Sequence, residues 1–268
     1  MKIAFLGGGN MASAIIAGLV TNGVAGQHIL VKDPHEDKRQ LLTKRYGVLT
    51  YASAGDWLSE ADVVVIAVKP QKLRECAQEV RQFIPDEALL LSIAASVSVQ
   101  TLRTWFNHKL VIRAMPNTPS LVGRGISGLY VPPDTADEHV RMARQILESV
   151  GKVVSVESED GIHLITGGSG SGPAYVFLFL EAFAQALEDQ GLTQHQAREL
   201  ALGTVDGAVQ LAQSTGENFE QLRLNVTSKG GTTAKAVEAL EANGIRDALS
   251  AAVKACIARS REMSELYR

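Results

Sequence analysis

The chain has 268 residues, 46% of them apolar, which is long enough for two modest domains of an ordinary globular protein. Its 26 basic and 29 acidic residues give a formal charge of -3 without a Lys/Arg run, which argues against charge-driven nucleic-acid binding. Cys76 and Cys256 lie far apart without a CxxC spacing, and the six His are scattered. We therefore expect free thiols, no metal site and a cytoplasmic protein. No apolar run is long enough for a membrane span.

A glycine-rich turn follows a short apolar strand, residues 3–6, at the start of the chain. Residues 7–12 read GGGNMA, which fits G-x-G-x-x-A, and a small-residue helix follows to residue 20. A second strand, 29–31, leads to Asp33, 21 positions after Ala12. That offset suits the acid that binds the ribose in dinucleotide folds, so a dinucleotide site is predicted. The alternative is a tight turn without a ligand.

Strand and helix patterns then alternate through the first two thirds of the chain. Apolar runs predict strands at 48–51, 63–68, 89–93, 110–112 and 126–131, with an edge strand at 153–156. Helical patterns lie at 36–46, 71–83 and 99–106, and Thr135 with Glu138 predicts a capping box for another helix. This order predicts a Rossmann-type, doubly wound, mostly parallel sheet. Its ligands should lie at the carboxyl ends of the strands, where Lys69-Pro70, 94–96 and 114–119 stand.

The last hundred residues have helical patterns. Residues 167–173, GGSGSGP, predict a flexible segment near a domain boundary, and we place a dinucleotide-binding domain at 1–163 and a helical domain at 164–268. Residues 174–187 are apolar almost all round, which predicts a central helix covered by a second copy of the chain. Burial against the chain's own first domain is the alternative. Thr193 with Gln196 predicts a capping box for the next helix.

A loop near the end of the chain, residues 225–233 (NVTSKGGTT, the hydroxyl loop), precedes a helical pattern at 234–243. It carries four hydroxyl side chains and a Gly230-Gly231 pair. Glycines that can adopt positive φ and the N–H groups of a helix start favour a bound anion. No His, Cys, Asp or Glu occurs between residues 226 and 237, so the loop should orient a ligand while the reactive group comes from elsewhere. Helix capping is the alternative role for each hydroxyl.

Five motifs together resemble pyrroline-5-carboxylate reductase along the whole chain. They are GGGNMA at 7–12, VKP at 68–70, RAMPNTP at 113–119, GSGPAY at 170–175 and NVTSKGGTT at 225–233. The resemblance implies that a nicotinamide cofactor reduces the cyclic imine Δ1-pyrroline-5-carboxylate to L-proline, the last step of proline synthesis. It also implies a Rossmann domain, a helical dimerisation domain, and homodimers that assemble into decamers as a pentamer of dimers.

The resemblance also implies site residues. The substrate would be held by Asn225, Ser228, Gly231, Thr232 and Thr233, and the Thr233 hydroxyl would approach the ring nitrogen as the catalytic contact. Gly7, Gly9, Asn10 and Met11 would line the cofactor's pyrophosphate, with Asp33 at its ribose. Ala67, Lys69 and Pro70 would lie on the ribose and nicotinamide side, and Ala94 beside the nicotinamide.

The choice between cofactors stays open at this point. The family implies NADP (NADPH), with NADH as the alternative. Asp33 would accept the ribose 2′-hydroxyl of NADH and repel a 2′-phosphate, but Lys32, His35, Lys38 and Arg39 surround it with positive charge.

Two other functions compete with the reductase. A β-hydroxyacid-dehydrogenase-like oxidoreductase would usually rely on a Lys on the long helix, where this chain has Glu181 and no Lys. A non-catalytic dinucleotide-binding regulator would be expected to have an eroded second site. The intact hydroxyl loop argues against it.

Overall fold

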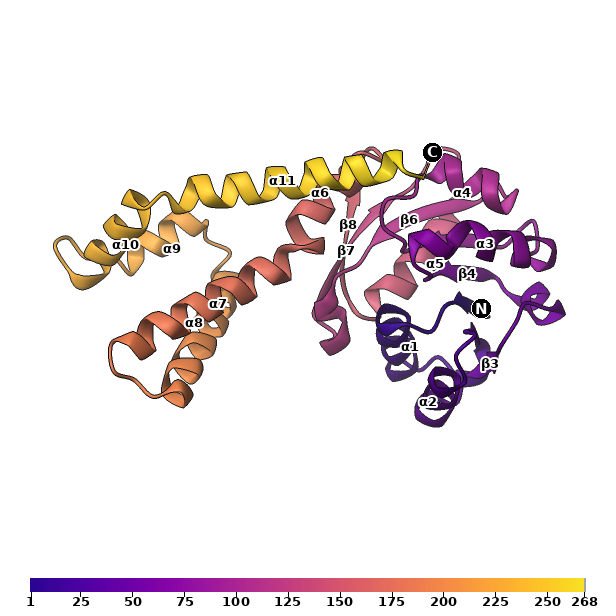
Figure 1. Cartoon of the computed structure of the whole chain (residues 1–268), viewed down its shortest axis with the longest axis horizontal. Helices are drawn as coiled ribbons and strands as arrows, with labels where there is room; N and C mark the ends of the chain where they lie inside the picture. The colour runs from indigo at the N-terminus through magenta and orange to yellow at the C-terminus, as the bar shows by residue number, and fades with distance from the viewer. Residues whose placement is uncertain (268) are drawn as a thin grey trace. The chain divides into compact units, whose positions relative to one another are not determined.

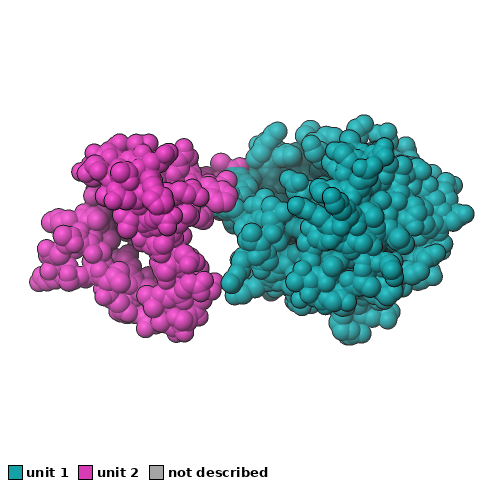
Figure 2. Space-filling view, turned by 90° about the horizontal axis from the view of Figure 1, so that it is seen from below, with its two compact units in different colours: residues 1–173, 256–268 teal, residues 174–255 magenta. Residues whose placement is uncertain are grey.

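The computed structural model describes residues 1–267. Contacts divide the chain into two compact units, coloured separately in Figure 2. Unit 1 comprises residues 1–173 and the chain from Cys256 onward, and unit 2 comprises residues 174–255. The predicted domain boundary after residue 163 stays a prediction. No helix among residues 1–267 has the length and apolar character needed to cross a bilayer.

Unit 1 is built on one eight-stranded sheet with the order β3-β2-β1-β4-β5-β6-β7-β8. The strands are β1 (Ile3–Leu6), β2 (Ile29–Lys32), β3 (Leu49–Tyr51), β4 (Val63–Ile66), β5 (Leu89–Ser92), β6 (Val111–Met115), β7 (Gly125–Tyr130) and β8 (Gly151–Val156). All neighbours are parallel except β6 and β7. The first six strands follow the Rossmann order, so the predicted fold class is confirmed, including the edge strand β8.

Helices cover both faces of the sheet (Figure 1). Ile3 and Phe5 of β1 pack into one core cluster with side chains of α1 (Asn10–Thr21), α2 (Glu36–Tyr46) and α5 (Asp137–Glu148). Ala4 and Leu6 point to the opposite cluster, with α3 (Pro70–Val80) and α4 (Val99–Phe106). Successive strand residues face opposite sides, which is why uninterrupted apolar runs form these strands.

One predicted helix start is wrong. The helix expected to begin with a Thr135–Glu138 capping box begins at Asp137, with Ala136 as N-cap and no side-chain cap. The Thr135 N–H instead donates to the Pro132 carbonyl at 3.1 Å, so a turn takes up this residue before the helix starts. The other capping box is confirmed: Thr193 caps α8 (Gln194–Thr215), with Gln196 completing the box.

The glycine-rich segment predicted to be flexible is helical. α6 (Gly161–Ile165) leads into a π turn (Thr166–Gly170) and then α7 (Gly172–Asp189), with Pro173 in the first turn as expected. Unit 2 contains most of α7, then α8, α9 (Phe219–Asn225), α10 (Thr232–Ala242) and the first part of α11 (Ile245–Glu265).

The apolar helix α7 has no fully buried residue in the single chain. Phe177 is 64% exposed and Leu178 is 65% exposed. The prediction that this helix is central is therefore not met within one chain. Uncovered aromatic and aliphatic side chains of this size are typical of an association surface.

Candidate active site

The glycine turn after β1 has a backbone geometry that only glycine satisfies at its first position. Gly7 has φ of 101°, and a Cβ on it would lie 2.8 Å from the carbonyl oxygen of Ala67. Its N–H donates to the Lys32 carbonyl at 2.8 Å. Gly9 is the N-cap of α1, whose first residues are Asn10 and Met11. The open N–H groups and dipole of this 12-residue helix suit a bound pyrophosphate, so the residues fit a dinucleotide.

The other predicted cofactor residues lie at the same edge of the sheet. The N–H of Ala67, directly after β4, donates to the Leu6 carbonyl at 2.9 Å. Lys69 is the N-cap of α3, and Pro70 occupies its first turn. Ala94, two residues after β5, is 5% exposed. Because β1, β4 and β5 are parallel neighbours, their carboxyl ends bring these residues together.

Asp33 follows β2 and is 4% exposed. Its carboxylate accepts hydrogen bonds from the N–H groups of Gly8 and His35, each at 2.9 Å, and lies 2.8 Å from Nδ1 of the His35 ring. Lys38 Nζ is 4.0 Å away. Burial raises the pKa of Asp33, but these hydrogen bonds and Lys38 outweigh it, so the pKa is below its usual value. Asp33 is thus a carboxylate that links the glycine turn to the end of β2 through its hydrogen bond from Gly8.

Ser96 belongs to the predicted strand-end segment 94–96, but the sequence did not indicate its backbone conformation. It follows β5, is 5% exposed and has φ of 64°, one of two positive φ values among the non-glycine residues described. Such backbone is uncommon outside glycine and concentrates at functional sites. No local sequence pattern marks a Ser for this conformation.

Two glycines shape the end of the hydroxyl loop, where the helix α10 begins. Gly230 has φ of 74°, whereas Gly231 does not have positive φ. A Cβ on Gly231 would lie 2.4 Å from Ser228 Oγ, so glycine lets that hydroxyl approach the backbone. Gly231 is the N-cap of α10, and no side chain caps the helix. The capping role considered for Thr232 and Thr233 is therefore wrong.

Two further polar residues of the loop bond within its own surroundings. The Asn225 amide donates to Glu217 Oε2 at 3.0 Å and accepts from Gln221 Nε2 at 2.7 Å. Thr227 Oγ1 donates to the Arg223 carbonyl at 2.6 Å. Ser228, Thr232 and Thr233 remain exposed. The substrate roles of this loop stay predictions.

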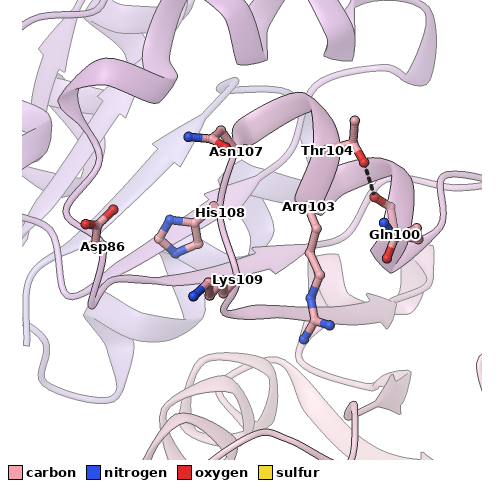
Figure 3. Close-up of a pocket in the computed structure, with 7 residues that line it drawn as sticks. All are labelled: Asp86, Gln100, Arg103, Thr104, Asn107, His108 and Lys109. Atoms are coloured by element: carbon pink, nitrogen blue, oxygen red, sulfur yellow. Dashed lines mark hydrogen bonds between the residues drawn. The ribbon is translucent and has the colours of Figure 1, made fainter.

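A polar pocket of about 470 Å³ lies elsewhere in unit 1 (Figure 3). Its lining includes Asp86, Arg103, His108 and Lys109. His108 is buried beside the Ala88 carbonyl, with Nε2 at 2.6 Å, and burial lowers its pKa. These residues precede β5 and β6, so the pocket is at the amino ends of the strands, opposite the glycine turn. Among residues 1–267, no three His, Cys, Asp or Glu side chains gather as a metal site.

Comparison with known proteins identifies the family. The chain is 39% identical to the pyrroline-5-carboxylate reductase of Haemophilus influenzae over 99% of this chain and 98% of that protein. The chain belongs to the pyrroline-5-carboxylate reductase family. Residues 159–263 match the family model for pyrroline-5-carboxylate reductase dimerisation. Residues 2–96 match the model described as NADP oxidoreductase, coenzyme F420-dependent.

Solved structures of pyrroline-5-carboxylate reductases agree over the full length. The enzyme from Coxiella burnetii has a TM-score of 0.93 and 38% identity, covering 98% of both chains. The enzyme from Plasmodium falciparum, solved with NADP bound, has a TM-score of 0.86 and 26% identity, again covering 98% of both chains. Family membership favours the reductase over the β-hydroxyacid dehydrogenase and regulator alternatives.

Proposed function

We propose that this chain is a pyrroline-5-carboxylate reductase, which transfers a hydride from NAD(P)H to the C=N bond of Δ1-pyrroline-5-carboxylate and yields L-proline. The observation that carries the proposal is the full-length relationship to reductases of that name. Two features of the structure support it: the glycine turn, whose backbone suits a bound pyrophosphate, and the exposed hydroxyl loop. The reaction is the last step of proline synthesis, and the two free cysteines are consistent with a cytoplasmic setting.

The cofactor, when bound, supplies the hydride, so the protein residues need to bind and orient. Gly7, Gly9, Asn10 and Met11 would hold the pyrophosphate against the start of α1. The residues that follow β4 and β5 would hold the ribose and the nicotinamide: Ala67, Lys69, Pro70 and Ala94.

NADPH is the cofactor we infer. Asp33 already accepts hydrogen bonds from Gly8 and His35, which compensate its charge. Lys38 and Arg39 stand near it, and Arg39 Nη1 donates to the Asp33 carbonyl at 2.8 Å. Lys32 contributes less than the sequence suggested, because its Nζ pairs with Glu79 at 2.7 Å. NADH remains the second cofactor.

The hydroxyl loop would bind the substrate. Ser228, Gly231 and Thr232 would face its carboxylate at the start of α10, where the N–H groups and helix dipole favour an anion. Thr233 would direct its hydroxyl to the ring nitrogen and orient the imine. Asn225 would support the loop through its bonds to Glu217 and Gln221.

The test of the function is turnover by the purified chain. Adding pyrroline-5-carboxylate to enzyme and NADPH should consume the reduced cofactor and form proline in equal amounts, both measured in one assay. The ratio of kcat/KM for NADPH to that for NADH should exceed one. No consumption with either cofactor would refute the reductase, and a strong NADH preference would refute the cofactor choice.

Self-association is the second part of the proposal. The match to a dimerisation family model and the exposed side chains of α7 support a homodimer, with a decamer of five dimers as the larger assembly. Light scattering at micromolar concentration should give a mass of at least twice 28.7 kDa. The Phe177→Glu variant should shift the protein towards monomer. A monomeric parent protein would contradict the proposal.

A further inference from the structure

The π turn at Thr166–Gly170 is a backbone feature that its own sequence does not favour. Its letters are TGGSG, and the Ser171 N–H donates to the Thr166 carbonyl at 2.9 Å, the five-residue spacing of a π turn. Each glycine in a helix costs about 1 kcal/mol relative to Ala. Contacts from elsewhere in the fold must therefore hold this turn, and π turns of this kind occur frequently at functional sites.

Asn117 provides one of these contacts. Its Nδ2 donates to the Ser169 carbonyl at 3.0 Å, and its Oδ1 accepts from the Ile126 N–H at 2.9 Å. The side chain is buried, since the residue is 7% exposed. A carbonyl on one side and an N–H on the other fix which way the amide points. One side chain thus joins the end of β6, the strand β7 and the π turn.

The π turn lies across the end of β6. A Cβ built on Gly170 would lie 3.1 Å from Met115 Cε, and one built on Gly128 would lie 2.6 Å from Ile165 Cγ1. Met115 and Gly128 are register partners in the β6–β7 pair. The segment from Ile165 to Gly170 is therefore packed on this pair, and the close approach needs glycine at Gly128.

The same place borders the proposed nicotinamide contact. Ser92 of β5 is in register with Arg113 of β6. Ala94 and Met115 each follow two residues later, and neighbouring strands lie about 4.8 Å apart. Within the sheet Met115 is followed by Gly128 of β7, and Gly170 lies against the Met115 side chain, on the face of the β6–β7 pair. The π turn stands beside the carboxyl ends of the strands at which a Rossmann sheet binds its ligand.

We propose that the π turn forms a wall of the nicotinamide end of the cofactor site, and that Asn117 is the residue that positions this wall. The inference rests on the proposed cofactor site. Asn117 acts through the turn without touching the cofactor. Loss of its amide donor should misplace the wall and so disturb the nicotinamide, whereas the adenosine end, held at the glycine turn and Asp33, should be unaffected.

Asn117→Asp tests this directly, because the carboxylate keeps the acceptor for the Ile126 N–H and loses the donor to Ser169. We expect kcat for imine reduction to fall by about tenfold or more, since small misplacements at a reacting centre have effects of this size. The Kd for NADPH, from nicotinamide fluorescence, should rise, whereas the Kd for adenosine 2′,5′-bisphosphate should stay within about twofold. The two binding measurements need no imine turnover, so a failure of the proposed reaction is separable from a failure of this inference.

Two further variants complete the experiment. Gly170→Ala alters the π turn at its contact with Met115. The new methyl would lie 3.1 Å from the flexible end of the Met115 side chain and 3.6 Å from the Ile165 carbonyl oxygen. It should produce the same pattern of constants if Asn117→Asp does not fold. Asn22→Ala is the matched control, because the Asn22 amide also bridges two segments. It donates to the Gly18 carbonyl at 2.8 Å and to the Ser149 carbonyl at 3.3 Å. Asn22 lies at the carboxyl end of α1, away from the glycine turn. The control should leave all constants unchanged. Equal weakening of NADPH and adenosine 2′,5′-bisphosphate, or no change in any constant, would overturn the proposal.

Discussion

The Thr233→Ala variant is expected to lose at least about tenfold in turnover, while the Kd for NADPH stays within about twofold, because the hydroxyl would contact the substrate and not the nucleotide. In the structure the Thr233 hydroxyl does not cap its helix. Thr233 is the second residue of α10 and is exposed, and the helix has Gly231 as its N-cap without a side-chain cap. Steady-state kinetics with NADPH and pyrroline-5-carboxylate, together with fluorescence titration of NADPH, measure both quantities.

Two comparison variants separate the hydroxyl's role from general damage to unit 2. Thr233→Ser retains a hydroxyl and should recover most of the turnover. Ser214→Ala removes a hydroxyl that donates to the Leu211 carbonyl at 2.9 Å near the end of α8, and should leave kcat unchanged. Unchanged turnover in Thr233→Ala, or a parallel loss of NADPH affinity, would remove Thr233 from the proposed contact with the ring nitrogen.

The Glu159→Ala variant is expected to lower the melting temperature more than the loss of an exposed ion pair does. Glu159 Oε1 lies 2.7 Å from Arg113 Nη1 and accepts from the Val99 N–H at 2.7 Å. The Arg113 side chain is only 3% exposed, so removing the carboxylate leaves a buried charge unpaired. A loss of about 3 kcal/mol follows, or about 6–12 °C in Tm for a chain of this size. Differential scanning calorimetry at one protein concentration measures it.

The neighbouring ion pair is the control for this experiment. Asp160 pairs with Arg261, but both side chains are about half exposed. Exposed pairs contribute about 0–1 kcal/mol, so Asp160→Ala should shift Tm by less than about 4 °C. Replacing both members of the buried pair, Arg113→Met with Glu159→Leu, should recover most of the loss, because no unpaired charge remains. Equal shifts for Glu159→Ala and Asp160→Ala would show that burial of Arg113 does not decide the effect.

Much of unit 1 could be predicted from the sequence because its signals are local. An apolar strand, a glycine turn and a helix in succession require Gly7 at a backbone conformation that other residues rarely adopt. Runs such as residues 63–66 are apolar at every position because both faces of the sheet are covered. The edge that holds the proposed cofactor residues then follows from the rule for parallel sheets.

Features that depend on partners distant in the chain could not be predicted. The bond between Asn117 and Ser169 spans 52 positions, so a glycine-rich segment that predicts flexibility is held instead as a π turn. The hydrogen bonds of the Asp33 carboxylate could not be predicted from the sequence either, because one of the donors is the N–H of Gly8, 25 positions earlier. The turn that displaces the expected Thr135 cap is more local: the Thr135 N–H bonds back to the Pro132 carbonyl, and the helix begins two residues later at Asp137.

The sequence by itself determined the fold class and the chemical types available, because backbone sterics and the period of apolar residues are properties of neighbouring residues. The tertiary structure alone decided which of those groups are already engaged: the Asp33 carboxylate, the Asn117 amide and the Lys32 ammonium are bonded, whereas the Thr232 and Thr233 hydroxyls do not cap their helix. The physical reason is that a hydrogen bond depends on distance and direction in space, and these become defined only when distant segments pack.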